Sequence, residues 1–161
     1  MKHLTFILIL VTSFVFGQDT PSKIDLLLNN WHEAAAKADF QNYFNLMDEQ
    51  SVYIGTDATE RWEKQEFMTY AKPYFDKGKA WTFKPLKRNI TLSKDKKTAW
   101  FDELLDTQMK ICRGSGVLVY KNGQWKIIQY VLSMTVPNEV TSKLIPLKSE
   151  LENDVIKNMK P

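Results

Sequence analysis

The sequence predicts an α+β fold in which a curved antiparallel sheet has helices packed on one face and is followed by a C-terminal helix. Apolar residues recur at helical spacing in the first half of the chain, whereas polar and apolar residues alternate in the second half. A further helical pattern follows the last alternating run. Helices that precede a meander of strands are typical of α+β domains.

The composition is that of an ordinary globular protein. The chain has 161 residues, which suit one domain, and a net charge of +3. This small and dispersed charge argues against a nucleic-acid partner. The single cysteine, Cys112, excludes an intramolecular disulfide. Two histidines and one cysteine without metal-binding spacing, and no phosphate-binding glycine loop, predict that no metal or cofactor is bound.

Residues 1–18 are expected to form a signal peptide. The positive start at Lys2 is followed by an apolar run over 4–16, which is short for a membrane span, and then by the small residue Gly17. An uncleaved anchor is the alternative. Cys112 lies far from the cleavage region, so a lipid-anchored cysteine there is excluded. We therefore expect a secreted or periplasmic protein with no membrane span after cleavage.

The first helix is predicted from the spacing of Ile24, Leu28 and Trp31. Ser22 and Asp25 resemble an N-terminal capping pair for this helix, although Glu or Gln is the usual partner. The helix forms one amphipathic face, which we expect to pack against the sheet.

Three further elements precede the meander. Asp39 is expected to cap a short second helix, and 51–54 to form a short strand. A polar loop over 56–61 leads to a third helix over 63–75. Pro73 is expected to distort this helix or end it early.

The meander is read from five alternating segments, of which the last three are long. They span 81–83, 90–92, 98–105, 111–120 and 125–135. Asn122 and Gly123 predict a type I′ hairpin turn between the last two, because both central positions of that turn need positive φ.

The C-terminal tail is predicted to be helical from Asn138, with Pro146 breaking it into two pieces. The expected organisation is therefore a signal peptide at 1–18, a domain of helices and a curved sheet at 19–137, and a helical tail at 138–161.

This order of elements, with particular residues on it, resembles the SnoaL-like branch of the nuclear-transport-factor-2-like superfamily over roughly 22–137. The residues that carry the resemblance are Tyr53-Ile54-Gly55-Thr56-Asp57 with Glu60 and Trp62, Trp100-Phe101-Asp102-Glu103, and the Trp125-Lys126-Ile127-Ile128 strand that ends near Ser133. The resemblance implies a cone-shaped, strongly curved antiparallel sheet. The N-terminal helices would pack on its concave face and close a pocket there. Members include isomerases, dehydratases, cyclases, epoxide hydrolases and non-enzymatic binding or assembly modules, so the fold does not decide the function.

Strand pairing predicts which side chains share a face of the sheet, and the family resemblance implies that the face with Trp125 and Ile127 lines the pocket. With a two-residue turn, Gly116 faces Gln129 and Gly114 faces Val131, and a symmetric preceding turn brings Glu103 opposite Gly114. A slip of one residue would replace Phe101 and Glu103 by Trp100 and Asp102. The expected interior comprises Phe101, Glu103, Cys112, Gln129 and Val131, rimmed by Asp57, Glu60, Trp62 and Trp81.

The opposite sheet face is expected to be apolar enough to need a cover. It would carry Arg113, Val117, Ile128, Tyr130 and Leu132. This favours a homodimer interface there, or a cover formed by the C-terminal helix.

Glu103 is the best candidate for a general acid or base, since burial in an apolar cone would raise its pKa. The alternative is a structural salt bridge with Arg113. Asp57 and Glu60, at the pocket mouth, suit ligand contact or acid–base work. Hydrogen bonds that cap the loop are the alternative for Asp57.

Superfamily enzymes commonly pair an Asp with a His or Tyr, yet this chain has Gln129 where many relatives have a last-strand His. His32 is expected on the surface of the first helix. Tyr53, Tyr130 or Gln129 could donate a hydrogen bond to an oxyanion. The tryptophans could line a pocket or simply fill a small core.

The leading hypothesis is a secreted or periplasmic protein that binds a small, largely apolar molecule, with Tyr53, Glu60, Trp62, Trp81, Phe101, Cys112 and Gln129 as contact residues. One alternative is a cofactor-independent isomerase or hydrolase that uses Glu103 or Asp57. The other is a non-catalytic dimeric accessory module.

Overall fold

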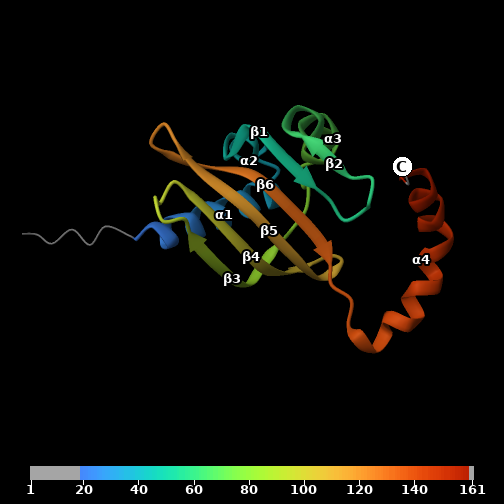
Figure 1. Ribbon diagram of the computed structural model, residues 1–161. Helices are drawn as coiled ribbons and strands as arrows, with labels where there is room; N and C mark the ends of the chain where they lie inside the picture. The colour runs from blue at the N-terminus through green and yellow to red at the C-terminus, as the bar shows by residue number, and fades with distance from the viewer. Residues whose placement is uncertain (1–18, 160–161) are drawn as a thin grey trace, which may run out of the picture.

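A computed structural model describes residues 19–159 as a curved sheet with three helices on one face and a fourth helix at the C-terminus (Figure 1). The predicted signal peptide over 1–18 lies outside the described residues. The α+β prediction is confirmed.

The first helix, α1 (Thr20–Ala36), buries the face that its periodicity predicts. Its N-cap is Asp19, whose carboxylate accepts a hydrogen bond from the Ser22 backbone amide at 3.0 Å. The expected capping role of Ser22 is therefore wrong. The helix α2 (Phe40–Asn45) is capped by Asp39 as predicted, through the backbone amide of Asn42.

The helix α3 (Lys64–Asp76) begins with a reciprocal capping box between Glu63 and Glu66. It continues three residues beyond Pro73, so this proline does not end it early. Prolines are tolerated where the lost amide bond falls in a terminal turn that tertiary packing supports. Ala71 and Phe75 of this segment are buried.

The six strands form one sheet in the order β2-β1-β6-β5-β4-β3. Their bounds are β1 (Met47–Ile54), β2 (Arg61–Glu63), β3 (Lys84–Leu92), β4 (Thr98–Thr107), β5 (Lys110–Lys121) and β6 (Gln124–Met134). The pairing of β1 with β6 is parallel, and the other pairs are antiparallel. The sheet is therefore mixed, which corrects the expectation of a wholly antiparallel one.

The turn between β5 and β6 has the predicted geometry, with φ of 53° at Asn122 and 80° at Gly123. The register follows the prediction as far as the pair Leu118↔Ile127. Val117 then pairs with Gln129, so β6 contains one extra residue, as in a β-bulge.

This bulge exchanges the two faces for the rest of β6. Tyr130 and Leu132 are buried against the helices, whereas Gln129 is exposed on the outer face. The predicted inward positions of Gln129 and Val131, and the outward positions of Tyr130 and Leu132, are therefore wrong. The β4–β5 register agrees with the prediction, with Glu103 opposite Gly114 and Phe101 opposite Gly116.

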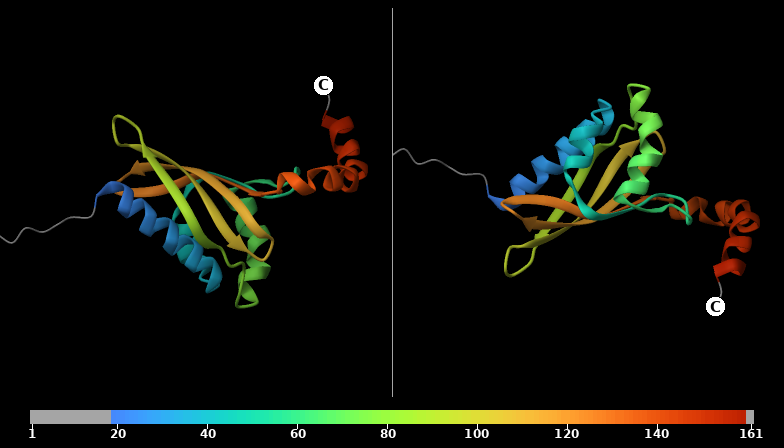
Figure 2. Two further views of the ribbon diagram at one scale, coloured as in Figure 1. Left: turned by 90° about the horizontal axis from the view of Figure 1, so that it is seen from below. Right: turned by 90° about the horizontal axis from the view of Figure 1, so that it is seen from above.

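The three N-terminal helices all lie on one side of the curved sheet (Figure 2). The core lies between these two layers and is unusually aromatic. Its largest fully buried side chains include Trp31, Tyr43, Phe67 and Tyr130. Such rings bury large areas and hold the helices against the sheet.

The C-terminal helix α4 (Asn138–Met159) is assigned as one continuous helix that contains Pro146, which corrects the prediction of two pieces. Its axis nonetheless bends, and it projects from the end of β6 away from the other helices (Figures 1 and 2). None of its residues is buried. Among the described residues, no helix is both long and apolar enough to span a membrane.

Candidate functional site

A cleft of about 220 Å³ opens where α3 meets the end of β1, β2 and the segment that leads into β3. Fourteen residues line it, and seven of them are aromatic. The lining residues are Tyr53, Gly55, Thr56, Glu60, Trp62, Phe67, Tyr70, Tyr74, Ala80, Trp81, Phe83, Gln108, Met109 and Leu132. We refer to this feature as the aromatic cleft.

The aromatic walls are ordered by ring stacking. Tyr53 stacks on Phe67 with ring centroids 4.0 Å apart, and Trp62 stacks on Tyr70 at 4.5 Å. Trp62 also stacks on Phe67 at 5.7 Å, so the rings of β1, β2 and α3 form one layer. Rings that pack against each other hold fixed orientations, which makes the cleft a preformed surface for a flat or apolar molecule.

Glu60 is the acidic residue of the aromatic cleft. Its Oε2 accepts a hydrogen bond from the backbone amide of Asp57 at 3.2 Å. A side chain at position 55 would collide with this carboxylate, so Gly55 provides the space that it occupies.

The charge of Glu60 acts on the tyrosines around it. Burial, followed by this charge, raises the pKa of Tyr53. The pKa of Tyr70 is raised to about 12, first by its interaction with Tyr74 and by burial, and then by Glu60. Both phenols are therefore neutral hydrogen-bonding groups near neutral pH.

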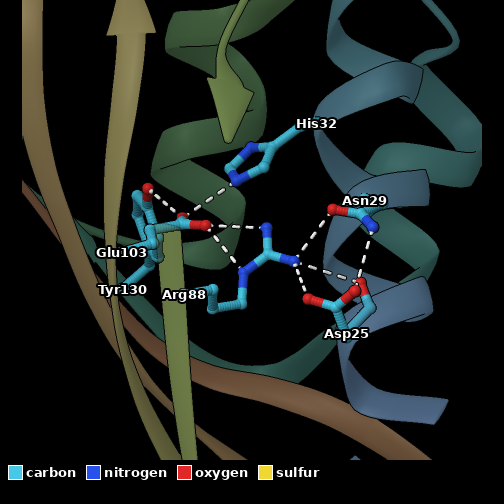
Figure 3. A network of polar contacts seen from close by, with 6 residues as sticks. All are labelled: Asp25, Asn29, His32, Arg88, Glu103 and Tyr130. Carbon is cyan, nitrogen blue, oxygen red and sulfur yellow. Dashed lines mark hydrogen bonds and ion pairs between the residues drawn. The ribbon is translucent and has the colours of Figure 1, made fainter. Parts of the chain in front are cut away.

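A buried polar network, drawn in Figure 3, packs against rings of the aromatic cleft. Its centre is Glu103, which is 1% exposed. The Oε1 atom accepts hydrogen bonds from His32 Nε2 and from the Tyr130 hydroxyl, both at 2.9 Å. The Oε2 atom accepts one from Arg88 Nε at 2.9 Å, and Arg88 Nη2 lies 2.7 Å from it.

Arg88 connects this network to α1 (Figure 3). Its Nη1 donates to the Asp25 carboxylate at 2.6 Å and to the Asn29 amide oxygen at 2.8 Å. Arg88 sits directly opposite Glu103 in the β3–β4 pairing. The network therefore joins α1, β3, β4 and β6 through charge-assisted hydrogen bonds.

The environment of Glu103 differs from the one expected of a catalytic acid. Burial raises the pKa of Glu103, but the hydrogen bond from His32 and the charges of His32 and Arg88 outweigh it and lower the pKa below its usual value. The expectation of a raised pKa is wrong. The alternative of a structural salt bridge fits better, although the partner is Arg88 rather than Arg113, which is exposed on the outer face.

Two glycines of β5 make room for this arrangement. A Cβ on Gly114 would lie 2.8 Å from Glu103 Oε1 and would also meet the Tyr130 hydroxyl. A Cβ on Gly116 would lie 2.7 Å from the Phe101 ring. Both glycines are thus explained by close side-chain packing, and the space above them is filled rather than open.

The aromatic cleft and the buried network around Glu103 are in contact. Tyr53 lines the aromatic cleft, and its ring centroid lies 5.5 Å from that of Tyr130. Phe83 also lines the cleft and lies 5.8 Å from His32. The buried network therefore supports the floor of the cleft, but Glu103 itself does not line it.

The site residues predicted from the sequence fall into three groups. Tyr53, Glu60, Trp62 and Trp81 meet in the aromatic cleft. Phe101, Glu103 and Cys112 are buried in the interior and do not line it. Gln129 lies on the other face of the sheet.

Asp57 has the geometry of a loop cap. It is exposed, and its Oδ1 accepts hydrogen bonds from the Thr59 amide at 2.9 Å and the Thr59 hydroxyl at 2.6 Å. These hydrogen bonds lower the pKa of Asp57. Asp57 does not line the aromatic cleft, which favours the capping interpretation over the catalytic one.

Sequence reasoning missed both basic partners of Glu103. His32 is 3% exposed, so its expected surface position is wrong. Its spacing of four residues from the buried Leu28 would have placed it on the inner face. Arg88 was missed because no strand was predicted over 84–89, and its cross-strand partner was therefore unknown.

Three aromatic residues of α3 were also missed as site residues, although Phe67, Tyr70 and Tyr74 recur at helical spacing. Tyr70 and Tyr74 are exposed at the edge of the cleft. Among residues 19–159, no group of three or more His, Cys, Asp or Glu side chains is arranged to hold a metal ion.

Comparison with known families agrees with this architecture. Residues 24–137 match the family model described as a SnoaL-like domain. The chain belongs to this family. Its fold is the one shared by solved NTF2-like proteins, as the sequence resemblance predicted. No protein of curated function shows significant sequence similarity to it.

Solved structures share the fold at low sequence identity. An NTF2-like protein of unknown function from Pseudomonas putida is 16% identical, with 77% of this chain and 94% of that chain covered and a TM-score of 0.62. A candidate ketosteroid isomerase from Parabacteroides distasonis is 21% identical, with 78% and 95% covered and a TM-score of 0.61. The association domain of CaMKII from C. elegans is 20% identical, with 70% and 94% covered and a TM-score of 0.58. At these identities the SnoaL-like protein shares a fold with them, and the fold alone does not transfer a function.

Proposed function

We propose that this SnoaL-like protein binds a small, largely apolar molecule in the aromatic cleft, as a secreted or periplasmic protein. The observation that carries the binding proposal is the set of seven aromatic side chains around one cleft. Ligand sites are commonly concave, mostly apolar and preformed, with a small number of placed polar groups. The export proposal rests on the signal-like pattern of residues 1–18 alone.

Binding is favoured over catalysis by the position of the carboxylates. Glu103 has both oxygens engaged and a lowered pKa, and it does not line the cleft. An isomerase or hydrolase mechanism through Glu103 would need access to the substrate and a proton to exchange. The Asp57 carboxylate accepts hydrogen bonds from Thr59 of its own loop.

The test is ligand-dependent melting with small neutral aromatic probes such as phenol and indole, followed by tryptophan fluorescence. A ligand at ten times its Kd raises the free energy of unfolding by about 1.4 kcal/mol. We expect Thr56→Trp, which places a large side chain in the lining, to abolish the shift. Ala58→Trp lies in the same loop outside the cleft and is expected to retain it. If neither these probes nor a small apolar cation such as choline shifts the wild-type melting curve, or if Thr56→Trp leaves the shift intact, the proposal is wrong.

A second candidate function is self-association through the outer sheet face. Trp100 is 48% exposed there, and it is paired across the sheet with Val117. Exposed apolar surface on a sheet favours contact with another protein surface. The structural likeness to an association domain is consistent with this candidate.

A further inference from the structure

The charge of the aromatic cleft is set by one residue. Glu60 is the only Asp, Glu, Lys, Arg or His among the fourteen lining residues. The chain as a whole has a net charge of +3, so this acidic cleft does not reflect a generally acidic protein. An ionised carboxylate in a mostly apolar cleft attracts a positive charge more strongly than it would in water.

Glu60 is also free of a basic partner. Within the part of the chain that the structure describes, no Lys, Arg or His lies within ion-pair distance of its carboxylate. Its hydrogen bond from the Asp57 amide uses one oxygen, Oε2, and leaves Oε1 available. A partly buried carboxylate without a counter-charge is costly unless a ligand supplies one.

The aromatic walls of the cleft also favour a positively charged ligand. The faces of Trp and Tyr rings carry negative potential and attract cations, and clusters of such rings bind alkylated ammonium groups. Trp62 and Tyr70, whose rings stack on each other with centroids 4.5 Å apart, line the cleft together with Glu60, Tyr53 and Trp81. The other polar side chains of the lining are neutral, so Glu60 is the charged partner that a cation would meet there.

We infer that the ligand of the aromatic cleft is a small alkylated ammonium compound, with its positive charge beside Glu60 and its alkyl groups against the rings of Trp62 and Tyr70. This inference rests on the proposed binding function and specifies its ligand class. The volume of about 220 Å³ lies below the range of roughly 300–1,000 Å³ for drug-sized ligands, so the molecule is small.

The experiment compares choline with its neutral carbon isostere, in which a quaternary carbon replaces the nitrogen, by isothermal titration at low salt. The two probes have the same shape and differ in charge. We expect choline to bind about tenfold more tightly, which corresponds to about 1.4 kcal/mol. Glu60→Gln is expected to remove most of this preference. Trp62→Leu is expected to weaken the binding of choline.

The matched control is Asp57→Asn, which removes the same charge from the same loop outside the cleft. It is expected to keep the preference for choline. If both probes bind equally well, or if neutral aromatic probes bind and choline does not, the inference is wrong and the binding function stands. If neither choline nor any neutral probe binds, both the inference and the proposed function are wrong. A preference that persists in Glu60→Gln also contradicts the inference.

Discussion

At the scale of single residues, Glu103 is defined by the groups that surround it. Its carboxylate is fully buried, and it accepts hydrogen bonds from α1, β3 and β6 through His32, Arg88 and Tyr130. A buried charge of this kind must be paired, because its removal from water costs several kcal/mol. The network therefore fixes where α1 lies on the sheet, and it does so directly behind the floor of the cleft.

The first prediction concerns the pH dependence of stability. Glu103 has a folded-state pKa below its usual value of 4.5, so its ionised form stabilises the fold fully above that pH. This stabilisation is lost as the pH falls through the lowered pKa. We expect Glu103→Gln to lower the free energy of unfolding by about 3 kcal/mol near neutral pH, because it leaves part of the Arg88 charge unpaired. In urea titrations, the difference from wild type should begin to shrink as the pH approaches 4.5 from above and should shrink further as the pH falls through the lowered pKa.

The control is Asp102→Asn, which removes the same charge from the adjacent residue of β4 on the exposed face. It should change stability by less than about 0.5 kcal/mol. A deficit for Glu103→Gln that stays constant over the whole pH range would show that the ion pair does not stabilise the fold.

Residue positions were predictable from the sequence where hairpin turns fix the register. The inward positions of Phe101, Glu103 and Cys112 follow from two short turns and the alternation of a strand. The predicted sheet faces of Tyr130 and Gln129 were wrong, because a single extra residue in β6 moves every later side chain to the other face. No local pattern at Ile128 marks the bulge, since it is a property of the paired strands.

At the scale of elements, the sequence predicts best those that carry their own signals. The cap of α2 and the Asn122-Gly123 turn follow from local chemistry. The three-residue strand β2 and the first half of β3 carry little signal, because pairing with neighbours creates them. The partner of Glu103 lay in the unrecognised part of β3, so this part of the site could not be derived from the sequence.

The second prediction, which belongs to the scale of elements, concerns α4. This helix has no buried residue, although Leu147 and Leu151 are exposed apolar side chains on it. Few contacts within the chain would be lost if it were absent. We expect the free energy of unfolding of a chain that ends at Pro137 to lie within about 0.5 kcal/mol of that of the full chain. Urea denaturation at low protein concentration measures both values. A loss of 2 kcal/mol or more, on the order of a buried contact, would mean that α4 packs against the body in solution.

At the scale of the whole molecule, the two faces of the sheet have different environments. The helices α1, α2 and α3 cover the concave face of the sheet (Figure 2). The aromatic cleft lies where α3 meets this face. Among residues 19–159, no helix covers the outer face, and α4 projects away from it. The proposed binding in the cleft and the proposed association through the outer face would therefore use separate surfaces.

The last prediction tests association through the outer face. If this face is the interface, sedimentation velocity of the wild type will show a dimer whose population rises with concentration. Trp100→Glu replaces an exposed apolar side chain of the outer face with a charge, whose desolvation would oppose contact, and should give a monomer.

Leu147→Glu is the control, because it adds the same charge to an exposed apolar position on α4. It should leave the dimer intact. If Leu147→Glu dissociates the dimer and Trp100→Glu does not, the interface lies on α4. If the wild type sediments as a monomer at every concentration, the outer face does not mediate self-association. Ligand binding in the cleft should be the same for the Trp100→Glu monomer and the wild type, since Trp100 lies on the opposite side of the sheet from Phe101 and Glu103.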